Sequence, residues 1–588
     1  MSAVAGGSFA AGLRAFVEEL VRAGLTDAIV CPGSRSTPMA LALAAHPALT
    51  MHVLLDERSA AFAALGMAKV ARRPVAVLVT SGTAAAELLP AAAEADLARV
   101  PLLLLTADRP AELRDRGAAQ TIDQVGLFGS HVRWAAEVPL MDGAPETLAQ
   151  WRWLAGRAMA EAAGTGRGAG PVALNLPYRE PLLPDGPLGP EPDLPGAPFV
   201  ASVEGRRRLD PDDLDALAGH LRGIRRGLIV AGPDDDPTVA GSVARLAAAT
   251  GYPILADGLA PARALPGAGG GEHLARPSAW LEAHLPELII RIGAIPTSRP
   301  LNELIARAEP ELWVLDGEAG WRQPAARPSV LLHADPAATL DALEVRMGRA
   351  PDPAGWTDDW AAARAAVDGA LSGWLAACDE PFEGLPFAAL SEVMREGVLW
   401  VGSSMPVRDL DAWWRGGRGV RVVASRGANG IDGVTSAAAG AEVAAAAAGE
   451  GPVVLVTGDV SLVHDLGGLV TARLLGAPLT IVLVDNDGGG IFSFLAQAAA
   501  DRPDVGLPAR FEQLFGTPHG TRVGEVATAL GATVREVDPR TLRPALTEAI
   551  ADRAPGVRLL RFPSDRARNV ALHRDAAAAA ARALEALA

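Results

Sequence analysis

Two polar residues in the last third of the chain have the types and the spacing that metal chemistry requires. Asp459 and Asn486 each follow closely on an apolar run, Val453–Val456 and Thr480–Val484 respectively. A helix-length segment rich in Leu and Ala lies between the runs, so we expect two parallel, neighbouring strands. Ligands of open α/β sheets bind at the carboxyl ends of the strands. Asp459 and Asn486 are therefore expected to lie together at that edge.

Carboxylate and amide oxygens are ligands that Mg²⁺ accepts in proteins. Glycines follow shortly after Asn486, and they free the backbone so that the carbonyl of Gly488 can turn inward as a further ligand. These protein oxygens, together with diphosphate oxygens and a water, would complete an octahedral shell. The alternative is an ordinary strand–helix–strand unit with an Asx turn after each strand.

The elements that must position these residues alternate along the whole chain. Short apolar runs, typical of parallel strands covered on both faces, alternate with helix-length segments. We predict an α/β fold with three doubly wound parallel-sheet domains, because 588 residues are too many for one core. The expected strands are Ala28–Cys31, Val75–Thr80, Leu102–Thr106, Val172–Leu176, Gly227–Ala231, Ile254–Ala256, Leu288–Ile292, Leu312–Asp316, Val330–His333, Leu399–Val401, Val420–Ala424, Val453–Val456, Thr480–Val484 and Val557–Phe562.

Stretches rich in proline and glycine mark the expected domain boundaries. We expect an α/β domain over residues 1–183, a Pro-rich linker over 184–207, a central α/β domain over 208–348, a linker and helix over 349–379, and a final α/β domain over 380–588.

Composition and charge exclude several classes of protein. The net charge of −16 argues against a nucleic-acid or anionic-membrane partner. The two cysteines, Cys31 and Cys378, exclude a disulfide framework and have no Cys/His metal spacing. No secretory signal is visible, and no apolar run reaches the ~18 residues of a membrane span. We therefore expect a soluble, cytoplasmic protein with no membrane span.

Loops of the expected first domain also carry polar and charged groups. Four such loops are expected at one sheet edge, which favours a site over unrelated caps and turns. Glu57 opens a helix of small residues, where the plain alternative is an acid stabilised by the helix dipole. The other residues of interest are Ser34, Arg35, Ser81, Gly82, Thr83, Arg109 and Gln120.

Longer strings around these residues resemble the thiamine diphosphate-dependent enzymes, in particular those of the menaquinone pathway. The similarity covers both outer domains and is weak in the middle. Two positions depart from the usual diphosphate motif: Val460 replaces a glycine, and Asp485 replaces the first Asn of a pair. The matching strings are CPGSRSTP (31–38), DERSAAFAALGMAK (56–69), TSGTAA (80–85), TADRP (106–110), GAAQTIDQ (117–124), GSSMPVRDLD (402–411), ASRGANGIDG (424–433), DNDGGGIFSFL (485–495) and FGTPHG (515–520).

The resemblance implies that the outer domains hold thiamine diphosphate between them. Glu57 would hydrogen-bond the aminopyrimidine ring, and Asp459, Asn486 and Gly488 would bind Mg²⁺, which Mn²⁺ can replace. The implied cofactor-binding residues are Glu57, Ser81, Gly82, Thr83, Ser404, Met405, Ile431, Gly458, Asp459, Val460, Ser461, Asn486, Gly488, Gly489, Gly490 and Ile491.

The resemblance also implies a transferase that decarboxylates 2-oxoglutarate and joins the remaining fragment to isochorismate. Both substrates carry carboxylates, which the planar guanidinium of arginine binds in a bidentate manner. We expect catalytic roles for Glu57, Arg35, Gln120, Arg408 and Arg426. The expected substrate-binding residues are Ser34, Arg35, Arg109, Gln120, Arg299, Arg408, Arg426, Ile491 and Phe492.

Two other functions remain open from the sequence. One is a different thiamine diphosphate enzyme, such as an acetolactate synthase or a 2-oxoacid decarboxylase, and the other is a non-catalytic binding protein of the same fold. No acid/base role is expected for His131, His464 or His519. The resemblance further implies a homodimer or a dimer of dimers, in which the first domain of one subunit and the third domain of another share each site.

Overall fold

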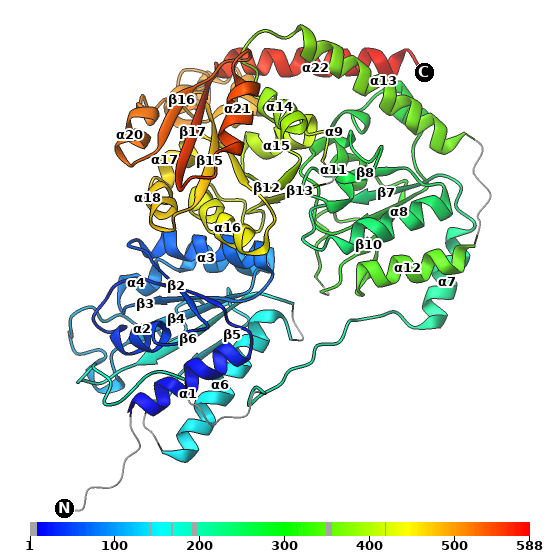
Figure 1. Ribbon diagram of the computed structural model, residues 1–588. Coiled ribbons are helices and arrows are strands. Elements are labelled where there is room, and N and C mark those ends of the chain that lie inside the picture. The colour runs from blue at the N-terminus through cyan, green and yellow to red at the C-terminus, as the bar shows by residue number, and fades with distance from the viewer. Residues whose placement is uncertain are drawn as a thin grey trace, which may run out of the picture.

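The computed structural model describes residues 9–141, 144–165, 168–190, 197–318, 320–348, 355–417 and 419–588. Parts of both expected linkers, residues 191–196 and 349–354, lie outside the described residues. The chain forms three units, each built around one sheet, which we call the first, second and third units in chain order. Figure 1 shows the first unit (blue and cyan) stacked against the third (yellow to red), with the second (green) beside the third.

Three parallel sheets form the cores of these units, which confirms the predicted fold class. In sheet order, the first contains β2 (Thr50–Val53), β1 (Asp27–Val30), β3 (Val75–Val79), β4 (Leu102–Asp108), β6 (Pro171–Pro177) and β5 (Trp134–Glu137). The second contains β11 (Val330–Leu332), β10 (Glu311–Leu315), β9 (Leu288–Ile292), β7 (Gly227–Ala231) and β8 (Ile254–Ala256). The third contains β13 (Gly419–Ala424), β12 (Glu396–Val401), β14 (Val453–Gly458), β15 (Pro478–Asp485), β17 (Gly556–Pro563) and β16 (Thr533–Glu536).

Helices cover both faces of each sheet. The first unit has α1 (Phe9–Arg22), α2 (Thr37–Ala44), α3 (Glu57–Ala71), α4 (Thr83–Ala86), α5 (Leu89–Ala98) and α6 (Pro145–Ala163). The second has α7 (Pro211–Leu221), α8 (Thr238–Thr250), α9 (Gly271–Leu274), α10 (Ala279–Ala283), α11 (Arg299–Ala306) and α12 (Pro336–Met347), and α13 (Trp356–Ala377) follows it. The third has α14 (Leu385–Val393), α15 (Met405–Trp413), α16 (Val434–Ala448), α17 (Asp459–His464), α18 (Gly467–Leu474), α19 (Ala496–Ala499), α20 (Val523–Ala529), α21 (Leu542–Ala551) and α22 (Arg566–Glu585).

The first and third sheets have the same strand order. When the strands of each unit are numbered in chain order, the first and third sheets both have the order 2-1-3-4-6-5. The second sheet, read from the edge formed by β8, has the order 2-1-3-4-5. All strand pairs are parallel. The carboxyl ends of the strands of each sheet therefore lie at one edge, where ligands of such sheets bind.

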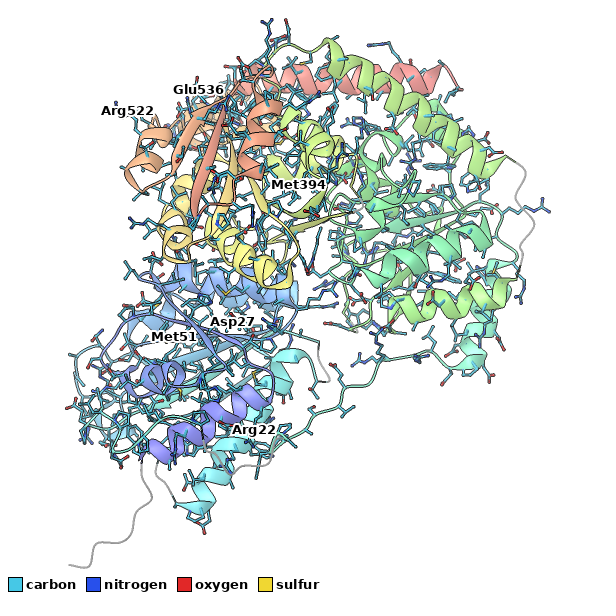
Figure 2. The ribbon with its side chains drawn as sticks, in the orientation of Figure 1. Arg22, Asp27, Met51, Met394, Arg522 and Glu536 are labelled. Atoms are coloured by element: carbon cyan, nitrogen blue, oxygen red, sulfur yellow. The ribbon has the colours of Figure 1, made fainter. Side chains whose placement is uncertain are left out.

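Every strand expected from the sequence is present, with small differences at the ends. The structure adds β2, β5 and β16, and each of the three lies at the edge of its sheet. Figure 2 labels residues in two of these places: Met51 lies on β2 near Asp27 at the start of β1, and Glu536 ends β16. Among the described residues, no helix has the length and apolar character needed to cross a membrane.

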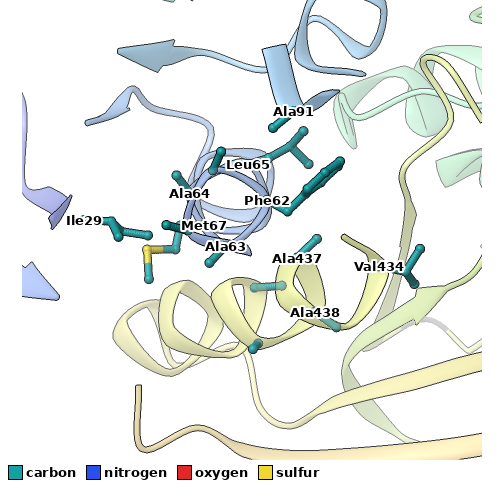
Figure 3. Packing of buried hydrophobic residues seen from close by; sticks show 14 of the residues in the cluster. Ile29, Phe62, Ala63, Ala64, Leu65, Met67, Ala91, Val434, Ala437 and Ala438 are labelled. Carbon is teal, nitrogen blue, oxygen red and sulfur yellow. The ribbon is translucent and has the colours of Figure 1, made fainter. Parts of the chain in front are cut away.

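Helices α3 and α16 pack so closely that their backbones are in contact, and this contact joins the first unit to the third. A Cβ at Gly66 would overlap the carbonyl oxygen of Ala437, and a Cβ at Gly440 would overlap that of Ala63. Figure 3 shows the small and apolar side chains of the two helices facing each other, with Phe62 beside them. The glycines allow this close approach, and the shared buried cluster fixes α3, which Glu57 opens, against the third unit.

Candidate active site

Asp459 lies where β14 ends and α17 begins, next to the end of β15. The two strands are parallel neighbours, with Gly458 opposite Val484. The side chain of Asp459 is buried, and its Oδ2 accepts a 2.9 Å hydrogen bond from the backbone N–H of Gly488. Its Oδ1 accepts one of 2.8 Å from the N–H of Val460. Burial raises the pKa of Asp459, and the two N–H donors act against that rise.

Asn486 follows β15 directly and carries a buried oxygen without a partner. Its Nδ2 donates a 2.9 Å hydrogen bond to Glu383 Oε1, while Oδ1 has no hydrogen-bond partner in the described part of the chain. Gly488 has a φ of 143°, and a Cβ there would overlap the carbonyl of Gly516, so the loop requires glycine. A buried carboxylate, an unpaired amide oxygen and a glycine backbone fit a divalent cation that also binds phosphate.

The donor types at this place narrow the choice of metal. Within the described ranges, no group of three or more His, Cys, Asp and Glu side chains could hold a metal ion. A cation beside Asp459 would therefore take amide, carbonyl and ligand oxygens as well. Mg²⁺ and Mn²⁺ accept such oxygen sets, whereas zinc sites are built mainly from Cys and His.

His519 lies against Asp459, a contact that the spacing of the histidines did not predict. Its Nε2 is 3.3 Å from Asp459 Oδ2, and its Nδ1 accepts a 3.0 Å hydrogen bond from the N–H of Thr521. Because Nδ1 accepts, the neutral ring carries its proton on Nε2 and donates to the carboxylate. Asp487 Oδ1 accepts from the N–H groups of His519 and Gly520, at 3.1 and 2.8 Å. The string FGTPHG was the only signal in the sequence for this loop.

Other predicted cofactor residues of the third unit surround the same strand ends. Ser404 precedes α15 with a φ of 71°, and Met405 is the buried first residue of that helix. Ser461, on α17, donates a 3.0 Å hydrogen bond from Oγ to the carbonyl of Ile431. That bond ties the helix that Asp459 opens to the loop before α16.

The glycine loop after β15 leads into a short 3₁₀ helix, Gly490–Phe494. The N–H of Gly489 donates a 2.8 Å hydrogen bond to the carbonyl of Gly516. Ile491 and Phe492 are half-buried, and the ring of Phe492 lies 5.7 Å from that of Phe515. Both side chains are therefore near enough to the metal loop to form an apolar wall.

In the first unit, Arg109 links several of the predicted residues. Its Nη1 contacts Ser81 Oγ and donates a 3.0 Å hydrogen bond to the carbonyl of Gln120. Burial lowers the pKa of Arg109, and the neighbouring charge of Arg35 lowers it further. Arg35 is buried and donates a 3.0 Å hydrogen bond to the carbonyl of Tyr178. Two guanidinium groups with adjacent polar groups form a site suited to a carboxylate.

The loops after β3 and β1 carry three more of the predicted first-unit residues. Gly82 has a φ of 84°, and its N–H donates a 2.8 Å hydrogen bond to Gln124 Oε1. Thr83 is the exposed first residue of α4. Ser34 is exposed in the loop that leads into α2, next to Arg35.

Glu57 is the first residue of α3 and is half-buried. The preceding residue, Asp56, caps the helix by accepting a 2.9 Å hydrogen bond from the N–H of Ser59. Burial raises the pKa of the Cys31 thiol to about 12, and the nearby charge of Glu57 contributes. In the described part of one chain, no hydrogen bond or ion pair joins Glu57 to the residues around Asp459.

Arg408 and Arg426 form a second arginine pair, in the third unit. Arg408 Nη1 donates a 2.6 Å hydrogen bond to the carbonyl of Ser404. The pKa of Arg426 is lowered, mainly by burial and also by the nearby charge of Arg408, while Asp257 acts in the opposite direction. Arg426 also lines a cavity of about 970 Å³ bounded by residues of all three units.

The loop that carries Arg426 is held by the first unit. Glu94, a buried residue of α5, accepts hydrogen bonds from the N–H groups of Gly427 and Ala428, at 2.8 and 2.6 Å. Arg299 differs from the other predicted arginines, because its side chain is 83% exposed at the start of α11 and pairs with Glu303. The structure does not bring Arg299 to either arginine pair.

Comparison with known proteins identifies the class of enzyme. The family "Thiamine pyrophosphate enzyme, N-terminal TPP binding domain" matches residues 11–127, and its C-terminal TPP binding domain matches residues 415–560. The fold is that of a solved benzoylformate decarboxylase from Polynucleobacter necessarius, with a TM-score of 0.72, 19% identity, and coverage of 94% of this chain and 98% of that one. Fold and matched domains define a thiamine pyrophosphate enzyme.

Curated relatives are more specific. The chain is 40% identical over 586 residues to the 2-succinyl-5-enolpyruvyl-6-hydroxy-3-cyclohexene-1-carboxylate synthase of Bacillus velezensis, covering 96% of this chain and 97% of the relative. It is 43% identical over 578 residues to the enzyme of that name from Chloroflexus aurantiacus, covering 95% and 94%. The chain belongs to this synthase family, as the resemblance predicted.

Proposed function

We propose that this chain catalyses the thiamine diphosphate-dependent decarboxylation of 2-oxoglutarate and the addition of the resulting four-carbon unit to isochorismate. The products are CO₂ and 2-succinyl-5-enolpyruvyl-6-hydroxy-3-cyclohexene-1-carboxylate, an intermediate of menaquinone biosynthesis, and the reaction takes place in the cytoplasm. One observation carries the proposal: Asp459, Asn486 and Gly488 converge at the ends of β14 and β15 in a chain of this family.

The third unit binds the charged end of the cofactor. Asp459, the unpaired Oδ1 of Asn486 and the carbonyl of Gly488 would hold Mg²⁺ or Mn²⁺ against the diphosphate. Ser404, Met405, Ile431 and Ser461 would pack along the cofactor. The remaining proposed contacts come from Gly458, Val460, Gly489, Gly490 and Ile491.

When bound, thiamine diphosphate supplies the nucleophilic carbon and stores the electron pair that CO₂ leaves behind. Glu57 would hydrogen-bond the aminopyrimidine ring and share a proton with a ring nitrogen, a task that needs a carboxyl group at that atom. Ser81, Gly82 and Thr83 would line the same ring. These residues belong to loops at the carboxyl edge of the first sheet.

The two arginine pairs suit substrates that carry several carboxylates. Arg35 and Arg109 lie together in the first unit, and Arg408 and Arg426 lie together in the third. Within each pair, the charge of one arginine lowers the pKa of the other, and a bound carboxylate would offset that repulsion. Ser34 and Gln120 add neutral polar groups, and Ile491 and Phe492 form an apolar wall. Arg299 would bind a substrate carboxylate only if its exposed side chain turned toward the substrate.

We further propose a homodimer, or a dimer of dimers, with shared sites. Among the described residues of one chain, Glu57 makes no hydrogen bond or ion pair with Asp459 or the residues around it. The residues just before Glu57 expose large apolar side chains: Met51, Val53 and Leu55, the last of them 66% exposed. A second copy whose third unit covers this strand would bury those side chains and bring its own Asp459 toward Glu57.

We also propose that the first domain ends at residue 183, that the central domain spans residues 208–348, and that the last domain begins at residue 380.

Measurement of CO₂ release from different 2-oxoacids tests the proposed reaction. With thiamine diphosphate and Mg²⁺, we expect release from 2-oxoglutarate and a product of the mass given by addition to isochorismate. Preference for pyruvate, with acetolactate as product, would instead identify an acetolactate synthase. Cofactor binding without CO₂ release from any 2-oxoacid would identify a binding protein.

A further inference from the structure

Glu383 is a buried acid that directly contacts a proposed metal ligand. It lies between α13 and α14 and is only 1% exposed. Its Oε1 accepts hydrogen bonds from Asn486 Nδ2 at 2.9 Å and from Ser564 Oγ at 2.8 Å. Its backbone N–H donates to Asn569 Oδ1 at 3.2 Å. Asn569 is itself a buried residue of α22, so the acid is anchored from behind.

The contact determines which way the amide of Asn486 faces. An Asn side chain offers two donors on Nδ2 and an acceptor at Oδ1, whereas a carboxyl oxygen that carries no proton only accepts. Glu383 Oε1 therefore selects Nδ2, and Oδ1 is turned the other way. There it is buried and has no partner in the described part of the chain. Leaving a buried amide oxygen unpaired costs free energy unless another group, such as a cation, binds it.

We infer that Glu383 is a positioning residue of the metal site, which acts through Asn486 and holds Oδ1 toward the cation. The inference rests on the metal assignment in the proposed function. Groups that bond to metal ligands from behind fix ligand orientation, and their loss typically weakens metal binding about 10–100-fold. Glu383 itself does not touch the metal.

The arrangement also predicts which substitution preserves the function of Glu383. Both donors bond to Oε1, whereas Oε2 is buried and finds no hydrogen-bond partner among the residues that the structure describes. A glutamine whose carbonyl oxygen takes the place of Oε1 keeps both hydrogen bonds. Alanine removes them, and aspartate, which is one methylene shorter, withdraws the acceptor from Asn486.

Mn²⁺ binding tests the inference without substrate or turnover. Free Mn²⁺ is measured by electron paramagnetic resonance with the full chain and thiamine diphosphate. Glu383→Ala should bind Mn²⁺ about 10–100-fold more weakly, and Glu383→Gln should stay close to wild type. Glu442→Ala is a matched control, because Glu442 is a buried acid on α16 that accepts a hydrogen bond from the N–H of Val453 at the start of β14. Wild-type affinity in Glu383→Ala would overturn the inference.

A double substitution separates positioning from general loss of structure. If Glu383 acts only through Asn486, Glu383→Ala should cause no further loss of Mn²⁺ affinity in an Asn486→Ala background. A second full loss there would contradict the inference. If Asn486→Ala alone leaves Mn²⁺ binding unchanged, the metal assignment itself is wrong.

Folding of the variants is checked by thermal melting. If Glu383→Ala does not fold, Glu383→Asp takes its place and should also bind Mn²⁺ more weakly. Wild-type affinity in Glu383→Asp, with Asn486→Ala impaired, would show that Asn486 is positioned without Glu383.

Discussion

The N–H of Gly488 donates a 2.9 Å hydrogen bond to Asp459 Oδ2 and so joins the loop that follows β15 to the first residue of α17. Asp459, which is expected to give a carboxylate to the metal, therefore also holds Gly488, which is expected to give a carbonyl. A substitution of Asp459 removes a charge and also releases the loop. Charge and loop geometry can be separated experimentally.

Asp459→Ala should abolish Mg²⁺-dependent binding of thiamine diphosphate, because it removes the only charged protein ligand in the proposed shell. Asp459→Asn keeps an acceptor for the N–H of Gly488 but loses the charge. It should lose most of the cofactor affinity, while its melting temperature should fall less than that of Asp459→Ala. Calorimetric titration and thermal melting measure the two effects. Unchanged cofactor affinity in both variants would remove Asp459 from the site.

Glu57→Gln should fold and bind thiamine diphosphate, but proton exchange at C2 of the cofactor should slow by orders of magnitude. An amide cannot share a proton with the ring nitrogen as a carboxyl group can. The exchange rate is measured by deuterium incorporation and nuclear magnetic resonance. Exchange at the wild-type rate would refute the role of Glu57.

Arg408→Ala and Arg426→Ala should raise KM for at least one substrate by roughly 10–150-fold, since a hydrogen bond to a charged group contributes on the order of 1.5–3 kcal/mol. Arg535→Ala is the matched control: its exposed side chain on the edge strand β16 pairs with Glu548 and belongs to no predicted site, so KM should change little. Wild-type KM for both substrates in the first two variants would place that pair outside the pocket.

Gly440→Ala should destabilise the fold by about 1–3 kcal/mol or more, because the new Cβ would overlap the carbonyl of Ala63 where α3 packs on α16. Gly373→Ala on α13 is the control, since a Cβ there would have no described atom within 4 Å. The Gly373→Ala change should raise the free energy of unfolding by roughly 0.5–1 kcal/mol. Denaturant unfolding measures both, and equal effects would contradict the close packing of the two helices.

The sequence predicted every strand inside a sheet and the edge strands β8, β11 and β13, but it missed the edge strands β2, β5 and β16. β2 is the clearest example, because most of its residues are exposed and Thr50–Val53 contains no apolar run. Edge strands pair on one side only, so their sequences carry a weaker signal.

The sequence also predicted Asp459, Asn486 and Gly488 as a group, and the structure brings them together because each lies at the end of a strand. Glu383 and Glu94 were not predicted. They bond to Asn486 and Gly427, which lie 103 and 333 positions further along the chain. Such pairs follow from the packing of units, which no local pattern encodes.

Subunit mixing tests most directly whether Glu57 of one subunit and Asp459 of another serve the same cofactor. Inactive Glu57→Gln and Asp459→Ala proteins are mixed, and exchange of subunits is verified independently. In a mixed dimer, one site carries both substitutions and the other carries neither. Activity should recover toward about a quarter of wild type, since random exchange makes about half of the dimers mixed, each with one intact site. No recovery after verified exchange would mean that each site is built within a single chain.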